Sequence, residues 1–279
     1  MQGARSPGAP IGVYDSGVGG LSVLRHIRAQ LPAEDLIYFA DSGHAPYGEK
    51  TEQYVVDRAL LVAAFLLERG AKALVVACNT ATVAAIKAVR ARYPELPVVG
   101  VEPGLKPAAA ITRSGKVGVL ATARTLKGDK FLQLREQISA ATRAEFLLQP
   151  CVGLVDQIEL GDLDTPAIAA LLERYVAPLL DQGADTLVLG CTHYPFVQAG
   201  IERVLRGHGH PDVTLIDTGD AVARQLVRLL DAGGLLHPAR GDGEAPASLR
   251  GYTTADVSAL APAFANLLGL HPPVEKVNV

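Results

Sequence analysis

The chain has 279 residues, of which 49% are hydrophobic and 20% are charged, and its formal net charge is -3. This composition supplies a packed core and excludes both a disordered chain and a single small module. Because the net charge is negative and the Lys and Arg residues are scattered, nucleic acid is not an expected partner. With no Trp and only 5% aromatic residues, the sequence also argues against sites that stack bases or sugars. A small polar ligand fits better.

No segment predicts a membrane span or an export signal. The longest wholly apolar run, Ala59–Leu67, is far shorter than the roughly 20 residues that a membrane helix needs. The segment Met1–Pro10 lacks the apolar stretch of a secretory signal and is interpreted as a short unstructured lead-in. Cys78, Cys151 and Cys191 are an odd number without CxxC spacing, which fits neither a disulfide framework nor a zinc site. We expect a cytoplasmic protein with free thiols and no bound metal.

Short β-branched runs alternate with amphipathic helical stretches along the chain, which predicts parallel sheet with crossover helices. The predicted strands are Ile11–Tyr14, Leu36–Phe39, Leu74–Ala77, Val98–Val101, Val117–Leu120, Glu145–Leu148, Leu187–Leu189 and Val213–Ile216. The predicted helices are Glu52–Arg69, Thr80–Tyr93, Pro166–Gln182, Phe196–Leu205, Ala221–Asp231 and Val257–Leu268.

The order of these elements runs twice along the chain. In each copy the third strand ends in a cysteine, in the segments ALVVACNTATVAA and TLVLGCTHYPFV. This duplication predicts two pseudosymmetric αβα domains, each with a mainly parallel sheet, that face each other across a ligand-binding cleft. The segment after Ile216 has no counterpart in the second copy and is expected to pack on the first half. The predicted domains are residues 1–102 together with 218–279, carrying Cys78, and residues 103–217, carrying Cys191.

Cys78 and Cys191 each lie at a predicted strand-to-helix turn, in the sequences Cys-Asn-Thr and Cys-Thr-His. Backbone N–H groups and the positive helix end favour a thiolate there. One thiolate could take a proton from a carbon while the other thiol returns a proton to the opposite face, which inverts a stereocentre. Such chemistry demands neither a metal nor an organic cofactor. Cys151 lacks this context and is assigned to packing.

Polar loops at other strand ends could bind the substrate. The glycines after Asp15 and Ser16 match neither the dinucleotide fingerprint nor the P-loop. They could expose N–H groups to a carboxylate while Asp15 binds an ammonium group or assists a thiol, although a tight turn capped by Asp15 is an equal alternative. Pro46, Tyr47 and Gly48 predict a turn that displays backbone N–H groups and a phenol.

The second half offers a matching set of polar residues. The hydroxyls of Thr122 and Thr125 could donate to a distal carboxylate or cap a helix. His193 could polarise the Cys191 thiol or protonate a ligand. Glu159 by itself indicates little, because an exposed Glu is the default.

Taken together, five segments resemble glutamate racemases: DSGVGGLSVL, ADSGHAPYG, ACNTAT, ATARTLKG and GCTHYPF. The likeness continues to YTTAD and the closing helix, so it covers nearly the whole chain after the first ten residues. It implies a cofactor-independent interconversion of L- and D-glutamate that supplies D-glutamate for peptidoglycan synthesis. It also implies two pseudosymmetric α/β halves and a homodimer.

The resemblance also implies roles for individual residues. Cys78 would act on the D isomer and Cys191 on the L isomer, assisted by Asp15 at the first thiol and by His193 and Glu159 at the second. The substrate-binding positions are matched by Asp15, Ser16, Tyr47, Gly48, Asn79, Thr80, Thr122, Thr125, Thr192 and His193. The chain departs from the family pattern at Gly43-His44-Ala45, Ala123-Arg124, Gly128, Phe131 and Asp156-Gln157.

Three alternatives stay open. An aspartate or other acidic amino-acid racemase would use the same chemistry with a different pocket length. A hydrolase with Cys191 as nucleophile and His193 as base is disfavoured, because the two-residue spacing makes their pairing awkward and Cys78 is left unexplained. A non-catalytic amino-acid or phosphosugar binding module could share the same two-domain plan.

Overall fold

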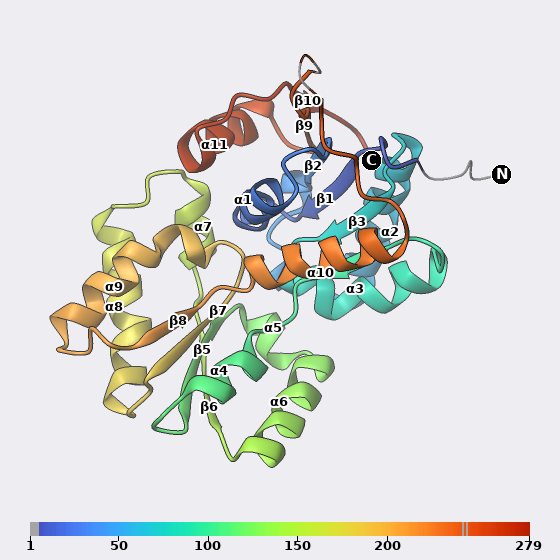
Figure 1. Cartoon of the computed structure of the whole chain (residues 1–279). Helices are drawn as coiled ribbons and strands as arrows, with labels where there is room; N and C mark the ends of the chain where they lie inside the picture. Colours follow the sequence, from blue (N-terminus) through green and yellow to red (C-terminus); the bar gives the residue numbers. More distant parts are fainter. Residues whose placement is uncertain (1–5, 242, 244) are drawn as a thin grey trace. The chain divides into compact units, whose positions relative to one another are not determined.

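The computed structural model describes residues 6–241, 243 and 245–279. The chain forms two compact units, one made of Met1–Val101 with Gly219–Val279 and the other of Glu102–Thr218 (Figure 1). Each unit has a parallel sheet of its own, which confirms the predicted α/β class. The predicted lead-in Met1–Pro10 lies partly outside the described residues.

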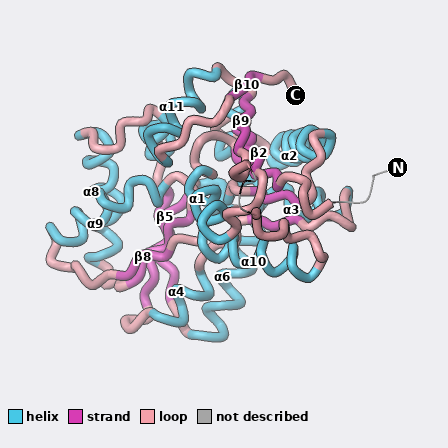
Figure 2. The backbone as a smooth tube through the Cα atoms, turned by 45° about the horizontal axis from the view of Figure 1, so that its top comes forward, coloured by secondary structure: helices cyan, strands magenta, loops and turns pink. Residues whose placement is uncertain are grey.

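The first unit is built on a sheet with the strand order β10-β9-β2-β1-β3-β4, in which all paired strands are parallel. Figure 2 shows β2, β9 and β10 side by side at one edge of this sheet. Every residue of β1, β2 and β3 is buried, as expected for parallel strands that are covered on both faces. The strands are β1 Ile11–Asp15, β2 Leu36–Ala40, β3 Ala73–Val76, β4 Val98–Gly100, β9 Leu249–Thr253 and β10 Val274–Lys276.

Two groups of helices cover the faces of this first sheet. Tyr14 of β1 shares a core with Leu66 of α2 and Ala85 of α3. Its neighbour Val13 is also fully buried and faces the opposite side, because strand side chains alternate. On that side α1 contacts α10 and α11. The helices are α1 Leu21–Gln30, α2 Glu52–Glu68, α3 Asn79–Arg92, α10 Gly219–Ala232 and α11 Val257–Leu268.

The second unit has a smaller parallel sheet with the order β6-β5-β7-β8. Leu120 of β5 packs with residues of α7, α8 and α9, whereas its neighbour Val119 packs with α4 and α6 on the other face. The strands are β5 Lys116–Ala121, β6 Glu145–Pro150, β7 Thr186–Gly190 and β8 Thr214–Ile216. The helices are α4 Leu105–Ile111, α5 Ala123–Lys127, α6 Asp129–Thr142, α7 Leu154–Glu159, α8 Pro166–Asp181 and α9 Gln198–Gly207.

The two sheets repeat one topology. Matched in chain order, β2-β1-β3-β4 of the first unit corresponds to β6-β5-β7-β8 of the second. In both units the third strand of the copy, β3 or β7, leads into the cysteine. The shared strand order supports the predicted duplication, to which the first unit adds β9 and β10.

The predicted elements differ from the observed ones at identifiable places. All eight predicted strands are present, with ends that move by at most two residues. The helix predicted from Phe196 begins at Gln198 instead, because Pro195 starts a separate 3₁₀ turn, Tyr194–Val197. Strands β9 and β10 were not predicted. β9 has Gly251 at its centre, where a Cβ would lie 2.9 Å from the Phe264 ring, so it lacks the β-branched run that marks a strand.

Candidate active site

Cys78 lies between β3 and α3 and caps the helix. Its backbone is extended, with φ -132° and ψ 119°, and its Sγ accepts a hydrogen bond from the backbone N–H of Ala81 at 3.4 Å. The side chain is buried. Ser, Thr, Asp or Asn usually fills this position, because an oxygen there satisfies an amide that the start of a helix leaves free. A cysteine at this place sets its sulfur against the positive end of the helix, which favours the thiolate.

Ser16 connects this thiol to the carboxylate of Asp15. Ser16 Oγ lies 3.7 Å from Cys78 Sγ and 3.4 Å from Asp15 Oδ1, to which it donates. The same carboxylate oxygen accepts the backbone N–H of Gly17 at 2.7 Å. Because β1 and β3 are parallel neighbours, the loops that follow them meet at one edge of the sheet. The turn after β1 therefore confirms that Asp15 caps a tight turn. Assistance of the first thiol by Asp15 stays a prediction.

Asn79 presents a buried amide that has no partner in the part of the chain that the structure describes. The residue is 4% exposed, and neither its Oδ1 nor its Nδ2 makes a hydrogen bond. Leaving such a group unsatisfied costs about 1–3 kcal/mol, so a ligand that brings both a donor and an acceptor would recover this loss. The next residue, Thr80, is equally buried. These two positions beside Cys78 suit the binding of a small polar molecule.

Tyr47 does not present its phenol as the sequence predicted. The side chain is 1% exposed and its hydroxyl donates to Asp41 Oδ2 at 2.5 Å, while Tyr14 donates to the Tyr47 oxygen at 3.5 Å. Burial, together with nearby Tyr14 and Asp41, raises the pKa of Tyr47 far above its usual value. The phenol therefore holds the loop from inside the unit, and the backbone of Tyr47 and Gly48 is the part of the turn that stays a predicted substrate contact.

Arg58 completes this buried network and was missed by the sequence reasoning. Its Nε donates to Asp41 Oδ2 at 2.9 Å and its Nη2 to Asp41 Oδ1 at 2.8 Å, a bidentate pair that is almost fully shielded from solvent. Thr254 Oγ1 also donates to Asp41, at 2.9 Å. The available signal was a charged residue inside the otherwise apolar face of α2, since a buried Arg needs a partner.

Cys191 directly follows β7, and its sulfur lies next to an imidazole that in turn contacts a carboxylate. His193 Nδ1 lies 3.6 Å from Cys191 Sγ, and His193 Nε2 lies 2.7 Å from Glu159 Oε1. His193 is 3% exposed, whereas the Glu159 side chain is 28% exposed at the end of α7. The expectation that two-residue spacing makes pairing of Cys191 and His193 awkward is wrong. The turn that leads into Tyr194–Val197 folds the imidazole back onto the sulfur.

The surroundings of His193 control its charge. Burial disfavours the protonated ring, but the hydrogen bonds to Cys191 and Glu159 and the negative charge of both groups hold the pKa of His193 well above its usual 6.5. These contacts therefore favour the protonated, positively charged ring beside the Cys191 sulfur. Glu159 in turn holds the ring by its far nitrogen. The structure thus connects three of the predicted residues, Cys191, His193 and Glu159, through consecutive side-chain contacts.

The threonines of the second unit lie at the ends of adjacent strands. Thr122 caps α5 by accepting the N–H of Thr125 at 3.2 Å, and the two hydroxyl oxygens are 3.0 Å apart. β5 and β7 are paired so that Ala121 is opposite Gly190, which places Thr122 beside Cys191 along the sheet edge. Thr192 is buried at the same edge. The helix-capping alternative holds for Thr122, and donation of its hydroxyl to a substrate carboxylate stays a prediction.

Cys151 lies in the apolar core of the second unit. Burial raises the pKa of its thiol to about 12, and its Sγ donates to the carbonyl oxygen of Gln149 at 3.5 Å. A thiol with such a pKa is neutral and unreactive at ordinary pH. This agrees with its assignment to packing.

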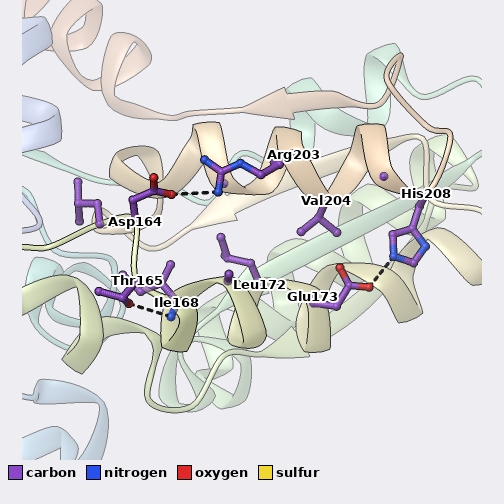
Figure 3. Close-up of a pocket in the computed structure, with 12 residues that line it drawn as sticks. Asp164, Thr165, Ile168, Leu172, Glu173, Arg203, Val204 and His208 are labelled. Carbon is purple, nitrogen blue, oxygen red and sulfur yellow. Dashed lines mark hydrogen bonds and ion pairs between the residues drawn. The ribbon is translucent and has the colours of Figure 1, made fainter.

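A groove of about 390 Å³ lies between α8 and α9, apart from the predicted site residues (Figure 3). Its floor is apolar, and ion pairs of Arg203 with Asp164 at 3.0 Å and of His208 with Glu173 at 2.6 Å mark its two ends. Gly200 lines the groove, and a Cβ there would lie 2.6 Å from Leu172 Cδ1. None of the residues that the sequence analysis singled out lines this groove.

Within residues 6–241, 243 and 245–279, no group of three or more His, Cys, Asp and Glu side chains is arranged to hold a metal ion. Over the same residues, every helix is too short or too polar to cross a bilayer.

Comparison with known proteins agrees with this geometry. Residues 11–226 match the family described as Asp/Glu/Hydantoin racemase. The glutamate racemase of Pseudomonas paraeruginosa is 52% identical over 271 residues, covering 97% of this chain and 98% of that protein. The crystal structure of glutamate racemase isoform RacE1 from Bacillus anthracis superimposes with a TM-score of 0.85 at 32% identity, covering 97% of this chain and 98% of that one. The Francisella tularensis glutamate racemase, solved in complex with D-glutamate, gives a TM-score of 0.82 at 29% identity and covers 98% of both chains.

The repeated α/β topology and the matched cysteines, together with these relatives, define an isomerase of the amino-acid racemase class. The chain belongs to the Asp/Glu/Hydantoin racemase family.

Proposed function

We propose that this protein interconverts L- and D-glutamate without a cofactor, with Cys78 acting on the D isomer and Cys191 on the L isomer. The observation that carries the proposal is the pair of cysteines at equivalent strand ends of two units with the same strand order. Each sulfur has its own group that favours a thiolate: the Ala81 N–H at Cys78 and the His193 ring at Cys191. The glutamate racemases of Pseudomonas paraeruginosa and Bacillus anthracis each match 97% of this chain.

The chemistry needs one thiolate and one thiol at a time. In the L-to-D direction the Cys191 thiolate takes the proton from Cα, and the electron pair of the C–H bond stays on Cα and spreads into the carboxylate. The Cys78 thiol then gives its proton to the opposite face, which leaves Cys78 as the thiolate and Cys191 as the thiol. The reverse reaction uses the same groups in the opposite roles. We therefore propose that the domains 1–102 with 218–279 and 103–217 face each other across the substrate.

Three residues assist the thiols in this scheme. His193 holds a positive charge beside Cys191, and Glu159 maintains that charge through its contact with the far ring nitrogen. Asp15 acts near Cys78 through Ser16 and supplies a negative charge that suits the substrate ammonium group. The two halves thus reach a similar thiolate by different means.

The remaining predicted residues would hold the substrate. The unpartnered amide of Asn79 can both donate to a carboxylate and accept from an ammonium group. Further polar contacts would come from the hydroxyls of Ser16, Thr80, Thr122, Thr125 and Thr192 and from the backbone of Tyr47 and Gly48. Holding a zwitterion rigidly while water is excluded lowers the barrier to forming the carbanion.

Proton exchange at Cα tests the proposal. The protein is incubated with enantiopure L-glutamate, D-glutamate, L-aspartate or D-aspartate in deuterium oxide, and deuterium at Cα and optical rotation are followed. We expect exchange and loss of optical rotation with both glutamate isomers only. Equal exchange with aspartate would overturn the substrate assignment. Tight binding of glutamate without exchange would indicate a binding module.

A cysteine hydrolase is the second candidate, because the contacts among Cys191, His193 and Glu159 are also those of a nucleophile with its base. The two candidates differ at Cys78. Racemisation requires both thiols, so Cys78→Ala should abolish turnover. Full turnover in Cys78→Ala with none in Cys191→Ala would favour the hydrolase.

We also propose that the product D-glutamate serves peptidoglycan synthesis in the cytoplasm and that the protein works as a homodimer. The support is the similarity to glutamate racemases over nearly the whole chain. Rescue of a D-glutamate auxotroph by the gene tests the first part. Sedimentation equilibrium tests the second, with a single species of twice the chain mass expected.

A further inference from the structure

Asp41 lies where α2, the loop after β2 and the end of β9 meet. Its carboxylate is fully buried and accepts two hydrogen bonds from Arg58, one from Tyr47 and one from Thr254. Arg58 comes from α2, Tyr47 from the loop after β2, and Thr254 directly follows β9. Hydrogen bonds to a charged group are stronger than those between neutral groups. The Asp41 carboxylate therefore holds these three parts of the first unit together.

Thr254 also contacts the backbone of the 41–49 loop, which connects β2 to α2. Its Oγ1 accepts the N–H of Gly43 at 3.0 Å, and its own N–H donates to the Ala40 carbonyl oxygen at 3.2 Å. A Cβ added at Gly43 would lie 2.8 Å from the Thr254 carbonyl oxygen, so this close approach depends on glycine. Because β2 and β9 are parallel neighbours, the segments that follow them meet at one edge of the sheet. The segment after β9 thus holds the loop both by its backbone and through Asp41.

Arg58 extends these contacts to the segment after β10. Its Nη1 donates to the Val279 carbonyl oxygen at 2.6 Å, while its Nε and Nη2 bind Asp41. Two residues earlier, the N–H of Val277 donates to the Thr253 carbonyl oxygen at 2.8 Å. The added strands β9 and β10 are therefore connected to Asp41 twice, through the residue after β9 and through the guanidinium of α2.

The second unit, Glu102–Thr218, lacks this arrangement, although the structure describes all its residues. The N–H of Asp41 donates to the carbonyl oxygen of Asp15, the last residue of β1, at 2.9 Å. The N–H of Cys151 donates in the same way to Ala121, the last residue of β5, at 3.0 Å. Asp41 and Cys151 thus occupy equivalent positions, but Cys151 packs in an apolar core and β6 is an edge strand. The buried carboxylate occurs in the unit that has the added strands.

We propose that β9 and the segment after it position the 41–49 loop for the substrate, through Thr254 and Asp41. This role rests on the proposed function, in which the backbone of Tyr47 and Gly48 contacts glutamate. Thr254 and Asp41 are positioning residues, because they act on the substrate only through the loop. A loop that is already ordered in its binding conformation loses less conformational entropy when the ligand binds, so the affinity is higher.

The test compares Thr254→Val and Thr254→Ser with the matched control Thr112→Val. Thr112 makes the same pair of contacts in the second unit: it donates to Asp185 Oδ1 at 2.5 Å and accepts the N–H of Gly115 at 3.1 Å. It precedes β5, at the sheet edge opposite to Cys191. Val has the shape of Thr without the hydroxyl, so each Val variant removes both contacts. Thr254→Ser keeps the hydroxyl and should behave as the wild type.

Steady-state racemisation of D-glutamate gives the first readout. In Thr254→Val we expect KM to rise about 10-fold, as for loss of a hydrogen bond to a charged group, with kcat changed less than about 3-fold. Both Val variants should have a lower melting temperature, but Thr112→Val should keep the wild-type KM. An unchanged KM in Thr254→Val, or an equal rise in Thr112→Val, would overturn the proposal. If Thr254→Val does not fold, Gly43→Ala separates the loop from Thr254 by steric contact and should raise KM in the same way.

Hydrogen exchange in the free protein measures the loop without turnover. Deuterium uptake by the amides of residues 42–49 should be faster in Thr254→Val than in the wild type and unchanged in Thr112→Val. If the wild type does not racemise glutamate, faster uptake in Thr254→Val still supports the positioning of the loop, and equal uptake rejects it. Racemisation by the wild type, with equal uptake and equal KM in Thr254→Val, would leave the proposed function standing and reject the role of Thr254.

Discussion

Cys78 caps a helix of 14 residues and takes a backbone N–H onto its sulfur, whereas Cys191 precedes a short 3₁₀ turn and faces an imidazole that is backed by a carboxylate. The two cysteines follow corresponding strands of a duplicated topology. Their place in the strand order is thus shared, whereas the groups around each sulfur differ. Under the proposed mechanism, one unit favours a thiolate through fixed backbone dipoles, and the other through the His193 side chain, whose charge depends on pH.

The largest effect is expected from removal of either sulfur. Cys78→Ala and Cys191→Ala should each lower racemisation by about 1000-fold or more, because each removes the only group that exchanges a proton on its face. Chiral chromatography of the product measures both. Cys151→Ala is the control and should keep wild-type turnover, since that thiol is buried in the core. Substantial turnover in either single variant would contradict the two-thiol scheme.

His193→Asn should have the next largest effect and should act on one unit only. We expect kcat to fall about 100-fold, because the cation beside Cys191 is lost.

The raised pKa of His193 also predicts that His193→Asn changes the stability of the fold in a pH-dependent way. Since the folded-state pKa lies above the unfolded value, the contacts of His193 stabilise the fold fully below about pH 6.5 and lose this effect as the pH rises through the folded pKa. Urea unfolding should show a larger gap between wild type and variant near pH 6 than at high pH, and a gap that grows with pH would contradict it.

Glu159→Gln should reduce kcat by about 10-fold, because the amide keeps a hydrogen bond to the ring but removes the negative charge. The pKa of His193 should fall, so the pH limb that reports this group should move to lower pH. Glu173→Gln is a matched control, since Glu173 forms a similar contact with His208 at 2.6 Å in the groove between α8 and α9. A pH profile that does not move in Glu159→Gln would separate Glu159 from the charge of His193.

Ser16→Ala should give the smallest change and should affect the Cys78 side. Loss of one neutral hydroxyl contact corresponds to about 1 kcal/mol, or roughly 5-fold in kcat/KM. The rate of Cys78 alkylation by iodoacetamide, followed by mass spectrometry, checks the same contact directly. Ser139→Ala, which removes a hydroxyl that donates to the Ala144 carbonyl at 2.8 Å, serves as the control. An effect as large as that of His193→Asn would mean that the two units depend on side-chain assistance to the same extent.

Local patterns were enough to predict β1 to β8 and the place of both thiols at strand ends. Alternating apolar runs and helical periods mark elements that bury their own side chains, and the repeated Cys at a strand end requires no knowledge of distant contacts. β9 was not predicted, because it forms by pairing with β2, and these two segments are far apart in the chain.

Side-chain networks were harder to predict for the same reason. Glu159 and His193 are 34 residues apart, so no local pattern could pair them from the residues alone. The family resemblance did suggest a shared role. Nothing in the turn sequence indicated that the Tyr47 phenol would be buried against Asp41. The same Asp41 carboxylate is also bound by Arg58, which lies in the following helix, α2.

A crystal structure with D-glutamate bound tests the central claim most directly. The account predicts that Sγ of Cys78 and Sγ of Cys191 each lie about 3–3.5 Å from Cα, on opposite faces of the carbon, as near-attack geometry requires. Both sulfurs on the same face, or either one too far to contact the substrate, would contradict it.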